Sequence, residues 1–331
     1  MIKNIKYKIK DIFLKTANMP LSGFLYRKIY SKAIKRGVNN FKISDLIVTI
    51  EPSNVCNSRC VMCPYPKMTR PKTVMSMDLF KKVVDECVSN GINKFNKFNL
   101  NFYNEPFLDP MIFERIEYLR LKSVRIQLFS NGSVLDDDKI DKIIKSGLND
   151  IKFSVDGFKK ETYEKIRKGL NYEKTVSNIL KLIERKKELK SPSPCITVVF
   201  VRSANNEYEQ EDFKKFWSGK ADKIIISFDD NRNDTSTDDL KNKPATAYPC
   251  RRLWKELVVM SNGKAALCCV DFDGSVILGD FNSQSFMEIW NGAKFNKIRE
   301  KHLMYKADEI PLCKKCAHPY RMNVSSWWRK K

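Results

Sequence analysis

Histidine is scarce in this sequence, with only two among 331 residues, at positions 302 and 318. The densest cysteine group, Cys56, Cys60 and Cys63, lies more than 200 residues before either of them. Structural zinc sites normally take four protein ligands, and these three cysteines have no fourth ligand nearby. The shortage of histidine therefore disfavours a zinc knuckle at this group.

Long apolar stretches are also missing. No run of about 18 apolar residues occurs, and lysine repeatedly interrupts the opening segment MIKNIKYKIKDIFLKTANMP, whereas membrane-spanning helices and signal peptides need an uninterrupted apolar core. The ten cysteines are grouped rather than spread along the chain as bridge partners, which is typical of metal ligation in a reducing compartment. We therefore expect a soluble, cytoplasmic protein.

Acidic residues are too few to balance the basic ones: 39 Asp and Glu face 61 Lys and Arg, a net charge of +22. Such a charge attracts phosphate-bearing substrates, nucleic acid or anionic membranes. The lysines are spread along the chain, and no arginine-rich block or aromatic-basic repeat favours nucleic acid. Residues 1–45 predict a basic, helical N-terminal extension that lies on a membrane or packs on the body, of which we favour packing.

Six short β-rich runs alternate with segments that carry apolar residues at helical spacing. The runs are residues 46–52, 98–103, 124–130, 150–156, 195–201 and 222–228. Strands that alternate with helices pair in parallel and carry the helices outside. Since six units are too few for the closed eight-unit barrel, these patterns predict an α/β fold that is either a partial, open barrel or a doubly wound sheet.

The composition changes after residue 229. Residues 230–248 contain almost no apolar side chains and predict a linker or active-site loop, which separates the strand-rich domain, residues 46–229, from a C-terminal domain, residues 249–331. In that domain we expect a hairpin that turns at Asn262-Gly263, a helix from about Ser285 to His302, and a knuckle in PLCKKC.

The cysteines of NVCNSRCVMCPYP follow directly after the first predicted strand. They should lie on a loop at its carboxyl end, where parallel β/α folds build their sites. Three thiolates can hold three irons of a [4Fe–4S] cluster. The fourth iron is then open to a substrate or cofactor.

This Cys-x3-Cys-x2-Cys loop resembles that of the radical S-adenosylmethionine (SAM) enzymes. NFYNEPFLDP resembles the family's Gly-Glu-Pro stretch, SNGSVL its Thr-Asn-Gly stretch, and FSVDGFKKETYEKIRKG its Ser-x-Asp-Gly segment. The resemblance covers residues 46–228 and implies a partial (β/α)6 barrel that binds SAM. It further implies that Glu105 and its neighbouring backbone receive the methionine amino group, that Ser154 and Arg167 contact the ribose and carboxylate, and that Asn131 belongs to the same site.

Two residues depart from the family pattern. Met62 stands where many members have an aromatic residue against the adenine, and Asn104 replaces a glycine. Neither change removes a charged ligand, so they leave only details of the adenosyl pocket in doubt.

A second cysteine set follows in the C-terminal domain. Cys250, Cys268, Cys313 and Cys316 can saturate one metal site, and zinc suits four thiolates as well as a cluster does. The segment resembles the SPASM and twitch extensions of radical SAM enzymes, which carry auxiliary [4Fe–4S] clusters, and its spacing is similar to that of 2-deoxy-scyllo-inosamine dehydrogenase, an aminocyclitol-oxidising member. One auxiliary cluster is the limit, because the segment has only five cysteines. Cys269 is the alternative to Cys268 as ligand, since adjacent residues of a strand face opposite ways.

The remaining cysteines and the histidines have simpler interpretations. Cys87 lies on an apolar helix stripe and Cys195 begins a strand, so both are expected to be small core residues. His302 ends a predicted helix and is interpreted as a partner of its C-terminal dipole. His318 is expected beside the ligands of the knuckle rather than among them.

The resemblance implies reductive cleavage of SAM to a 5′-deoxyadenosyl radical, which removes a hydrogen from the substrate. A saturated auxiliary cluster suits electron transfer, so we expect an oxidoreductase that converts a carbinol of a sugar-like or aminocyclitol-like, and in some cases phosphorylated, small molecule. A reductant such as flavodoxin or ferredoxin is the implied partner. The loop after the sixth strand offers Asp229, Asp230 and Arg232 as substrate contacts or proton acceptors, although a solvated linker explains them equally.

Three alternatives stay open. A radical epimerase would use the same cofactors and return a hydrogen atom from a thiol, for which Cys269 is the candidate. A peptide-modifying enzyme usually carries a recognition domain and a second auxiliary cluster, for which this chain offers little room. A non-enzymatic iron–sulfur or zinc protein would leave Glu105, Ser154 and Arg167 unexplained.

Overall fold

A computed structural model of the chain describes residues 42–228 and 249–316. Within them the chain forms two compact units. Residues 42–228 and 255–295 form the first, which we call the barrel unit, and residues 249–254 and 296–316 form the second, which we call the cysteine unit. The predicted linker at 230–248 and most of the N-terminal extension lie outside the described residues, so the predicted domain division stays a prediction.

The barrel unit is built on one curved sheet, which has nine strands within the described residues, in the order β6-β5-β4-β3-β2-β1-β7-β8-β9. The six predicted strands are β1 (Ile47–Ile50), β2 (Lys97–Asn99), β3 (Arg125–Ser130), β4 (Asp150–Ser154), β5 (Cys195–Arg202) and β6 (Lys223–Phe228). Each pairs in parallel with the next. The predicted parallel α/β fold is confirmed, and the two free ends of the strand order make it a partial barrel.

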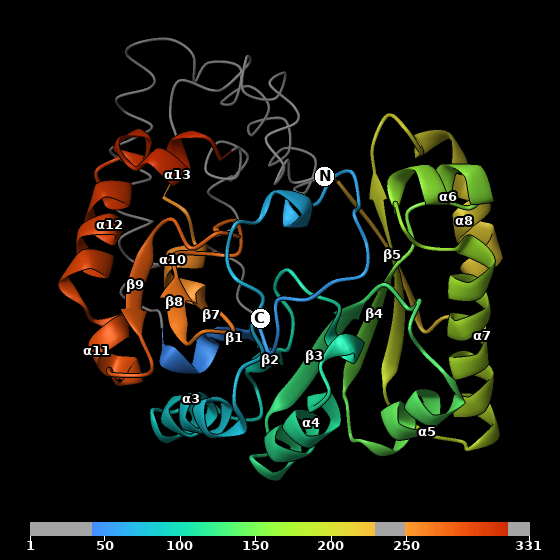
Figure 1. Ribbon diagram of the computed structural model, residues 1–331, viewed down its shortest axis with the longest axis horizontal. Helices are drawn as coiled ribbons and strands as arrows, with labels where there is room; N and C mark the ends of the chain where they lie inside the picture. Colours follow the sequence, from blue (N-terminus) through green and yellow to red (C-terminus); the bar gives the residue numbers. More distant parts are fainter. Residues whose placement is uncertain (1–41, 229–248, 317–331) are drawn as a thin grey trace, which may run out of the picture. The chain divides into compact units, whose positions relative to one another are not determined.

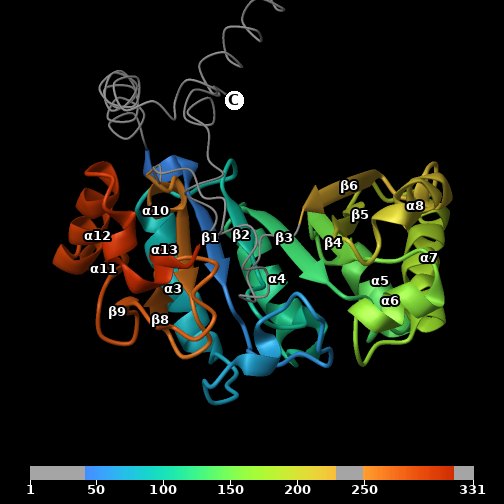
Figure 2. The same ribbon diagram turned by 90° about the horizontal axis from the view of Figure 1, so that it is seen from above.

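Six helices of the barrel unit's described residues lie along the outer side of this sheet (Figures 1 and 2). They are α3 (Met77–Ser89), α4 (Ile112–Leu121), α5 (Asp137–Lys145), α6 (Lys160–Ile166), α7 (Tyr172–Glu188) and α8 (Gln210–Trp217). Each of these helices has buried apolar side chains, and side chains of the strands, such as those of Val48, Phe98 and Phe153, are buried as well. The helices therefore close the outer face and leave the carboxyl ends of the strands to the loops.

Helix α3 shows how local sequence sets these elements. The side chain of Ser76 accepts a hydrogen bond from the Leu79 amide at 3.2 Å and caps the first turn. The buried stripe of the helix then includes Phe80, Val83 and Cys87, and Cys87 is completely buried. Its predicted role as a small core residue is confirmed. Cys195, the first residue of β5, is half-buried.

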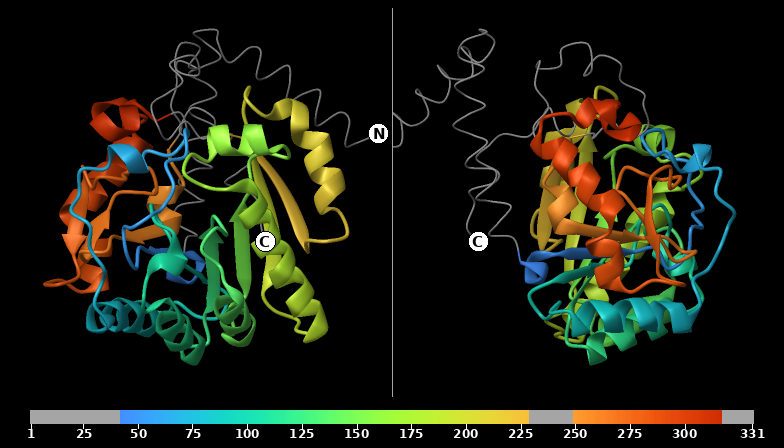
Figure 3. Two further views of the ribbon diagram at one scale, coloured as in Figure 1. Left: turned by 45° about the vertical axis from the view of Figure 1, so that its right-hand side comes forward. Right: turned by 90° about the vertical axis from the view of Figure 1, so that its left-hand side faces the viewer.

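The predicted hairpin is present as β7 (Glu256–Val259) and β8 (Lys264–Ala266), followed by β9 (Ile277–Asp280). It turns at Asn262-Gly263, where Gly263 has a φ of 85°, a conformation that glycine adopts readily. The sequence did not predict that β7 would pair in parallel with β1, with Val48 opposite Leu257. The hairpin thus continues the barrel sheet (Figures 1 and 3).

The single helix predicted from about Ser285 to His302 is wrong. The structure has two helices, α11 (Phe286–Trp290) and α12 (Ala293–Leu303). A capping box between Ser285 and Glu288 starts α11, and the break falls at Asn291-Gly292. A β-carbon at Gly292 would lie 3.0 Å from the Glu288 carbonyl oxygen, so the close approach of the chain favours glycine at the break.

The cysteine unit contains short helical elements, which are α10 (Arg252–Lys255, whose last residue belongs to the barrel unit), most of α12, η5 (Ala307–Glu309) and α13 (Pro311–Lys314). Its residues Leu253, Trp254, Ala307 and Ile310 are buried. Across the described part of the chain, no helix is both long enough and apolar enough to span a membrane.

Candidate active site

The loop of Cys56, Cys60 and Cys63 begins six residues after the end of β1 and is held by backbone hydrogen bonds. The Arg59 amide donates to the Lys168 carbonyl at 2.8 Å, and the Val61 amide donates to the Ile166 carbonyl at 2.9 Å. These contacts attach the loop to the end of α6. The cysteine loop is therefore positioned by backbone hydrogen bonds rather than by its cysteines alone.

The thiols of this loop lie in a partly buried polar environment. The hydroxyl of Ser58 lies 3.2 Å from the Cys56 sulfur and 3.3 Å from the Cys60 sulfur. Burial raises the pKa of the Cys56 thiol and raises that of Cys63 to about 11. Since metal ligation requires thiolates, loading of this loop should release protons.

Glu105 immediately precedes η3 (Pro106–Leu108), is its N-cap, and is 1% exposed. Its carboxylate accepts hydrogen bonds from the Ser130 hydroxyl at 2.8 Å and from the Asn131 amide at 2.7 Å. Burial raises the pKa of Glu105 to about 7 despite these donors. Its carboxylate thus joins the loops after β2 and β3, and a nearby cation would favour its charged form.

Asn131 connects the predicted SAM site to the cysteine loop. Its Nδ2 donates to the side-chain Oδ1 of Asn57 at 2.9 Å, and Nδ2 of Asn57 donates to the Ser133 hydroxyl, also at 2.9 Å. Asn131 and Ser133 are buried. The predicted residues Glu105 and Asn131 are therefore brought together, through Asn131 and Asn57, with the loop that carries the cysteines.

Arg167 follows α6 and reaches the same cysteine loop. One terminal nitrogen donates to the Cys60 sulfur at 3.3 Å, and the other forms an ion pair with Asp156. Burial alone would lower the pKa of Arg167, but the negative charge of Asp156 and its contact with Cys60 raise it overall. Ser154 is half-buried at the end of β4, two residues before Asp156. The sequence interpretation missed Asp156, although it stands in the quoted Ser-x-Asp-Gly segment.

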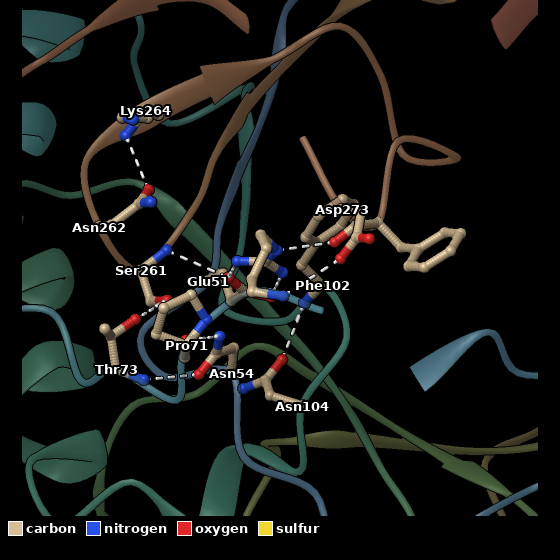
Figure 4. Close-up of polar contacts among 12 residues, drawn as sticks. Glu51, Asn54, Pro71, Thr73, Phe102, Asn104, Ser261, Asn262, Lys264 and Asp273 are labelled. Atoms are coloured by element: carbon tan, nitrogen blue, oxygen red, sulfur yellow. Dashed lines mark hydrogen bonds and ion pairs between the residues drawn. The ribbon is translucent and has the colours of Figure 1, made fainter. Parts of the chain in front are cut away.

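A polar clamp closes the base of the cysteine loop, and we define it as Glu51, Arg70 and Asp273. Glu51 and Asp273 are labelled in Figure 4. The guanidinium of Arg70 binds the buried Glu51 carboxylate at 2.8 and 2.9 Å. Its Nε donates to the Phe272 carbonyl at 2.7 Å, and Asp273 accepts from the backbone amide of Thr69 at 2.8 Å. The clamp therefore attaches the cysteine loop to the loop after β8.

That second loop carries Cys268 and Cys269. The hydroxyl of Tyr103 donates to the Cys269 carbonyl at 2.9 Å, and its ring packs against Phe272 with the centroids 5.9 Å apart. Tyr103 stands two residues before Glu105. Arg70, which follows the cysteine loop, and Tyr103, which precedes Glu105, thus both contact the loop of Cys268. Their spacing along the chain does not reveal this connection.

The cysteine unit brings together two other predicted ligands. The Cys250 amide donates to Nδ1 of His302 at 3.3 Å, and Nε2 of His302 lies 3.4 Å from the Cys313 sulfur. The Cys316 amide donates to the Cys313 carbonyl at 3.1 Å, which closes the knuckle. Cys268 belongs to the barrel unit, so the complete four-cysteine set stays a prediction.

His302 corrects one interpretation. It is completely buried, and burial lowers its pKa to about 4. An uncharged ring cannot favour the helix dipole as a cation would. The predicted residues Asp229, Asp230 and Arg232, as well as His318, lie outside the described residues.

Comparison with protein families distinguishes the two interpretations of the cysteine loop, a zinc knuckle and an iron–sulfur cluster. A model described as the radical SAM superfamily matches residues 50–214, and a SPASM model, described as an iron–sulfur cluster-binding domain, matches residues 250–317. The chain belongs to the radical SAM superfamily. A radical SAM protein with a SPASM domain uses SAM and two [4Fe–4S] clusters as cofactors, and one of the clusters is auxiliary.

Curated relatives are similar to part of this sequence. The GTP 3′,8-cyclase of Desulforamulus reducens is 27% identical over 183 residues, which cover 54% of this chain and 53% of the cyclase. The tungsten-containing aldehyde ferredoxin oxidoreductase cofactor-modifying protein of Pyrococcus furiosus is 25% identical over 168 residues, 49% of this chain and 44% of that protein. The chain spans about half the length of these curated relatives.

Solved structures share the radical SAM fold over more of the chain. BtrN in complex with AdoMet and 2-DOIA has a TM-score of 0.56 at 18% identity and covers 82% of this chain and 92% of BtrN. AnSMEcpe with bound AdoMet has a TM-score of 0.60 at 17% identity, over 83% and 89% of the two chains. SuiB of Streptococcus suis, bound to precursor peptide SuiA, has a TM-score of 0.63 at 13% identity, over 93% and 81%.

The residues of this radical SAM protein fit the cofactors. Among the described residues, Nε of Arg167 and Nδ2 of Asn104 are buried without a hydrogen-bond partner, and both can donate to the acceptors of a ligand. The thiols of Cys56, Cys60 and Cys63 can each bind a separate iron of a cluster. The donor set therefore suits a [4Fe–4S] cluster with SAM beside it.

Proposed function

We propose that this protein oxidises a carbinol of a small, sugar-like or aminocyclitol-like substrate. The cofactors would supply a 5′-deoxyadenosyl radical, which takes one hydrogen atom from the carbinol carbon, and an auxiliary cluster, which takes the remaining electron. The hydroxyl proton leaves to a base and a carbonyl forms, so the substrate loses two electrons and two protons in all. The observation that carries the proposal is the pairing of a three-cysteine loop with one further set of four cysteines.

The barrel residues would hold SAM against the cysteine loop. Arg167 would bind the methionine carboxylate through Nε, since its two terminal nitrogens already contact Cys60 and Asp156. Glu105 and its neighbouring backbone would receive the ammonium group. Ser154 and Asn131 would contact the rest of the cofactor from the ends of β4 and β3.

The auxiliary site would be held by Cys250, Cys268, Cys313 and Cys316. Four protein ligands leave no open iron, so the site would move an electron rather than bind substrate. Substrate contacts and the proton acceptor would come from Asp229, Asp230 and Arg232. The net charge of +22 would favour an anionic, for example phosphorylated, substrate, and flavodoxin or ferredoxin would supply the first electron.

The proposal is tested with reconstituted, reduced protein, SAM and a panel of sugars, aminocyclitols and their phosphates in deuterated water. We expect a ketone or aldehyde, formed in equal amount with 5′-deoxyadenosine. In a Cys313→Ala variant SAM cleavage should continue while the carbonyl product is lost. Solvent deuterium on carbon in a stereoisomer of the substrate would contradict oxidation and indicate an epimerase.

Peptide modification is the second candidate, because SuiB, whose structure contains the precursor peptide SuiA, shares the fold. The panel therefore includes cysteine-containing peptides. A peptide product formed in preference to every polyol would replace the carbinol proposal.

A further inference from the structure

His302 is a buried group that the proposed reaction does not use. It lies in the last turn of α12 and is 0% exposed. Its ring lies between two residues that we propose as auxiliary ligands, with Nδ1 at 3.3 Å from the Cys250 amide nitrogen and Nε2 at 3.4 Å from the Cys313 sulfur. Both ring nitrogens are thus engaged within the cysteine unit.

The Cys250 contact fixes which nitrogen carries the proton. A backbone amide can only donate, so Nδ1 of His302 must accept with its lone pair. A ring nitrogen that accepts carries no hydrogen, so the one N–H of the His302 ring is on Nε2. That N–H faces the sulfur of Cys313, which accepts the hydrogen bond.

The fold holds the ring in this place. One turn earlier on α12, Nε of the buried Arg299 donates to the Leu253 carbonyl at 3.0 Å, and the Leu253 amide donates to the Cys250 carbonyl at 3.3 Å. The same face of α12 therefore binds the turn at residues 250–253 at two points. Rotation of the His302 ring away from Cys313 would break its contact with Cys250.

We propose that His302 is a positioning residue for electron transfer, whose Nε2–H donates to the Cys313 thiolate and raises the reduction potential of the auxiliary cluster. A hydrogen bond to a ligand sulfur stabilises the more negative, reduced state of a cluster. The bond makes the cluster a better acceptor of the substrate's electron. This inference rests on the proposed function for its purpose, but its test requires neither substrate nor SAM.

The test compares two nearly isosteric substitutions. In a Cys56→Ala/Cys60→Ala/Cys63→Ala background only the auxiliary cluster should load, and its midpoint potential is measured by titration monitored with electron paramagnetic resonance. His302→Met removes the donor and should lower the reduced-to-oxidised ratio at fixed potential roughly tenfold, which equals about 59 mV for one electron. His302→Gln keeps an N–H donor and should stay near the original potential.

Equal potentials for the His302 and His302→Met proteins would overturn the proposal, and so would a shift shared equally by Met and Gln, which would indicate lost packing. A second measurement needs no substitution at position 302. With ¹⁵N-labelled histidine in a His318→Gln protein, His302 is the only histidine left in the chain. Pulsed resonance spectra of the reduced cluster should show one exchangeable proton and a ¹⁵N coupling, and their absence would also overturn the proposal.

These outcomes are distinct from failure of the proposed function. If the carbinol is not oxidised but the potential depends on the donor at position 302, the hydrogen bond stands and the reaction is reassigned. If the protein oxidises a carbinol with a potential that does not depend on His302, the reaction stands and this inference fails.

Discussion

Arg167 has three donor groups, and two of them already have partners. Its terminal nitrogens contact Cys60 and Asp156, while Nε is buried without a hydrogen-bond partner among the described residues. The ion pair with Asp156 holds the guanidinium in one orientation. This arrangement gives the residue a specific geometric role toward SAM that its place in the motif alone does not define.

Replacing Arg167 with Gln should weaken SAM binding about 10- to 150-fold, because a hydrogen bond to a charged group contributes about 1.5–3 kcal/mol. The dissociation constant is measured by equilibrium binding to the cluster-loaded protein. Lys168→Gln is the matched control, since it removes one adjacent positive charge from an exposed side chain. A similar loss in both variants would indicate general electrostatics instead of a direct contact.

Glu105 should make stability depend on pH in an unusual direction. Its pKa is raised to about 7 from an ordinary 4.5, so between these values the folded chain keeps a proton that the unfolded chain has lost. The stability that this proton provides is present below pH 4.5 and is lost as the pH rises to 7, by about 3 kcal/mol at most.

Denaturant unfolding of the SAM-free protein at several pH values within that window measures the effect. The Glu105→Gln variant keeps every other carboxylate of the parent. The difference between the two proteins in how unfolding free energy changes with pH therefore reports on Glu105 alone. We expect the parent to lose more stability than the variant as the pH rises. Parallel slopes would show that Glu105 titrates normally.

At the scale of elements, the clamp of Glu51, Arg70 and Asp273 joins loops that lie far apart in the sequence. Arg70 and Asp273 are 203 residues apart, yet the Arg70 amide donates to the Asp273 carboxylate at 3.3 Å. The side chain of Glu51 is 0% exposed and that of Arg70 is 8% exposed. The buried charge pair of Glu51 and Arg70 therefore fixes the guanidinium whose Nε binds the Phe272 carbonyl in the loop of Cys268.

Arg70→Met should cost about 3–5 kcal/mol of unfolding free energy, because it leaves the Glu51 charge buried without its partner. The Glu51→Gln/Arg70→Met double variant should recover part of this loss. Anaerobic denaturant unfolding of the loaded proteins gives both values. A single variant as stable as the parent, or a double variant less stable than the single one, would show that the pair does not hold the loops.

At the scale of the whole molecule, the sequence predicted what short contiguous segments determine. Six β-rich runs became β1–β6, and the cysteine loop follows the first of them, because both depend on local pattern. The parallel pairing of β7 with β1 could not be predicted, since Val48 and Leu257 lie far apart in the chain and nothing in either strand identifies its partner.

The candidate site likewise contains residues that local sequence identifies and residues that only the packing of distant segments identifies. Glu105, Asn131, Ser154 and Arg167 were found because each stands in a recognisable segment. His302 was misread because its burial depends on how α12 packs against residues 250–253, which no local pattern reports. The break at Gly292 had a sequence signal, since glycine disfavours a helix interior.

The central claim is that the loop of Cys56, Cys60 and Cys63 holds a cluster at which SAM is cleaved. The most direct measurement is the yield of 5′-deoxyadenosine and methionine when the reconstituted, dithionite-reduced protein is incubated with SAM. We predict both products from the parent protein and neither from a Cys56→Ala/Cys60→Ala/Cys63→Ala variant, which should still hold about four of the parent's roughly eight irons. Failure of a parent protein loaded with both clusters to form 5′-deoxyadenosine would contradict the account.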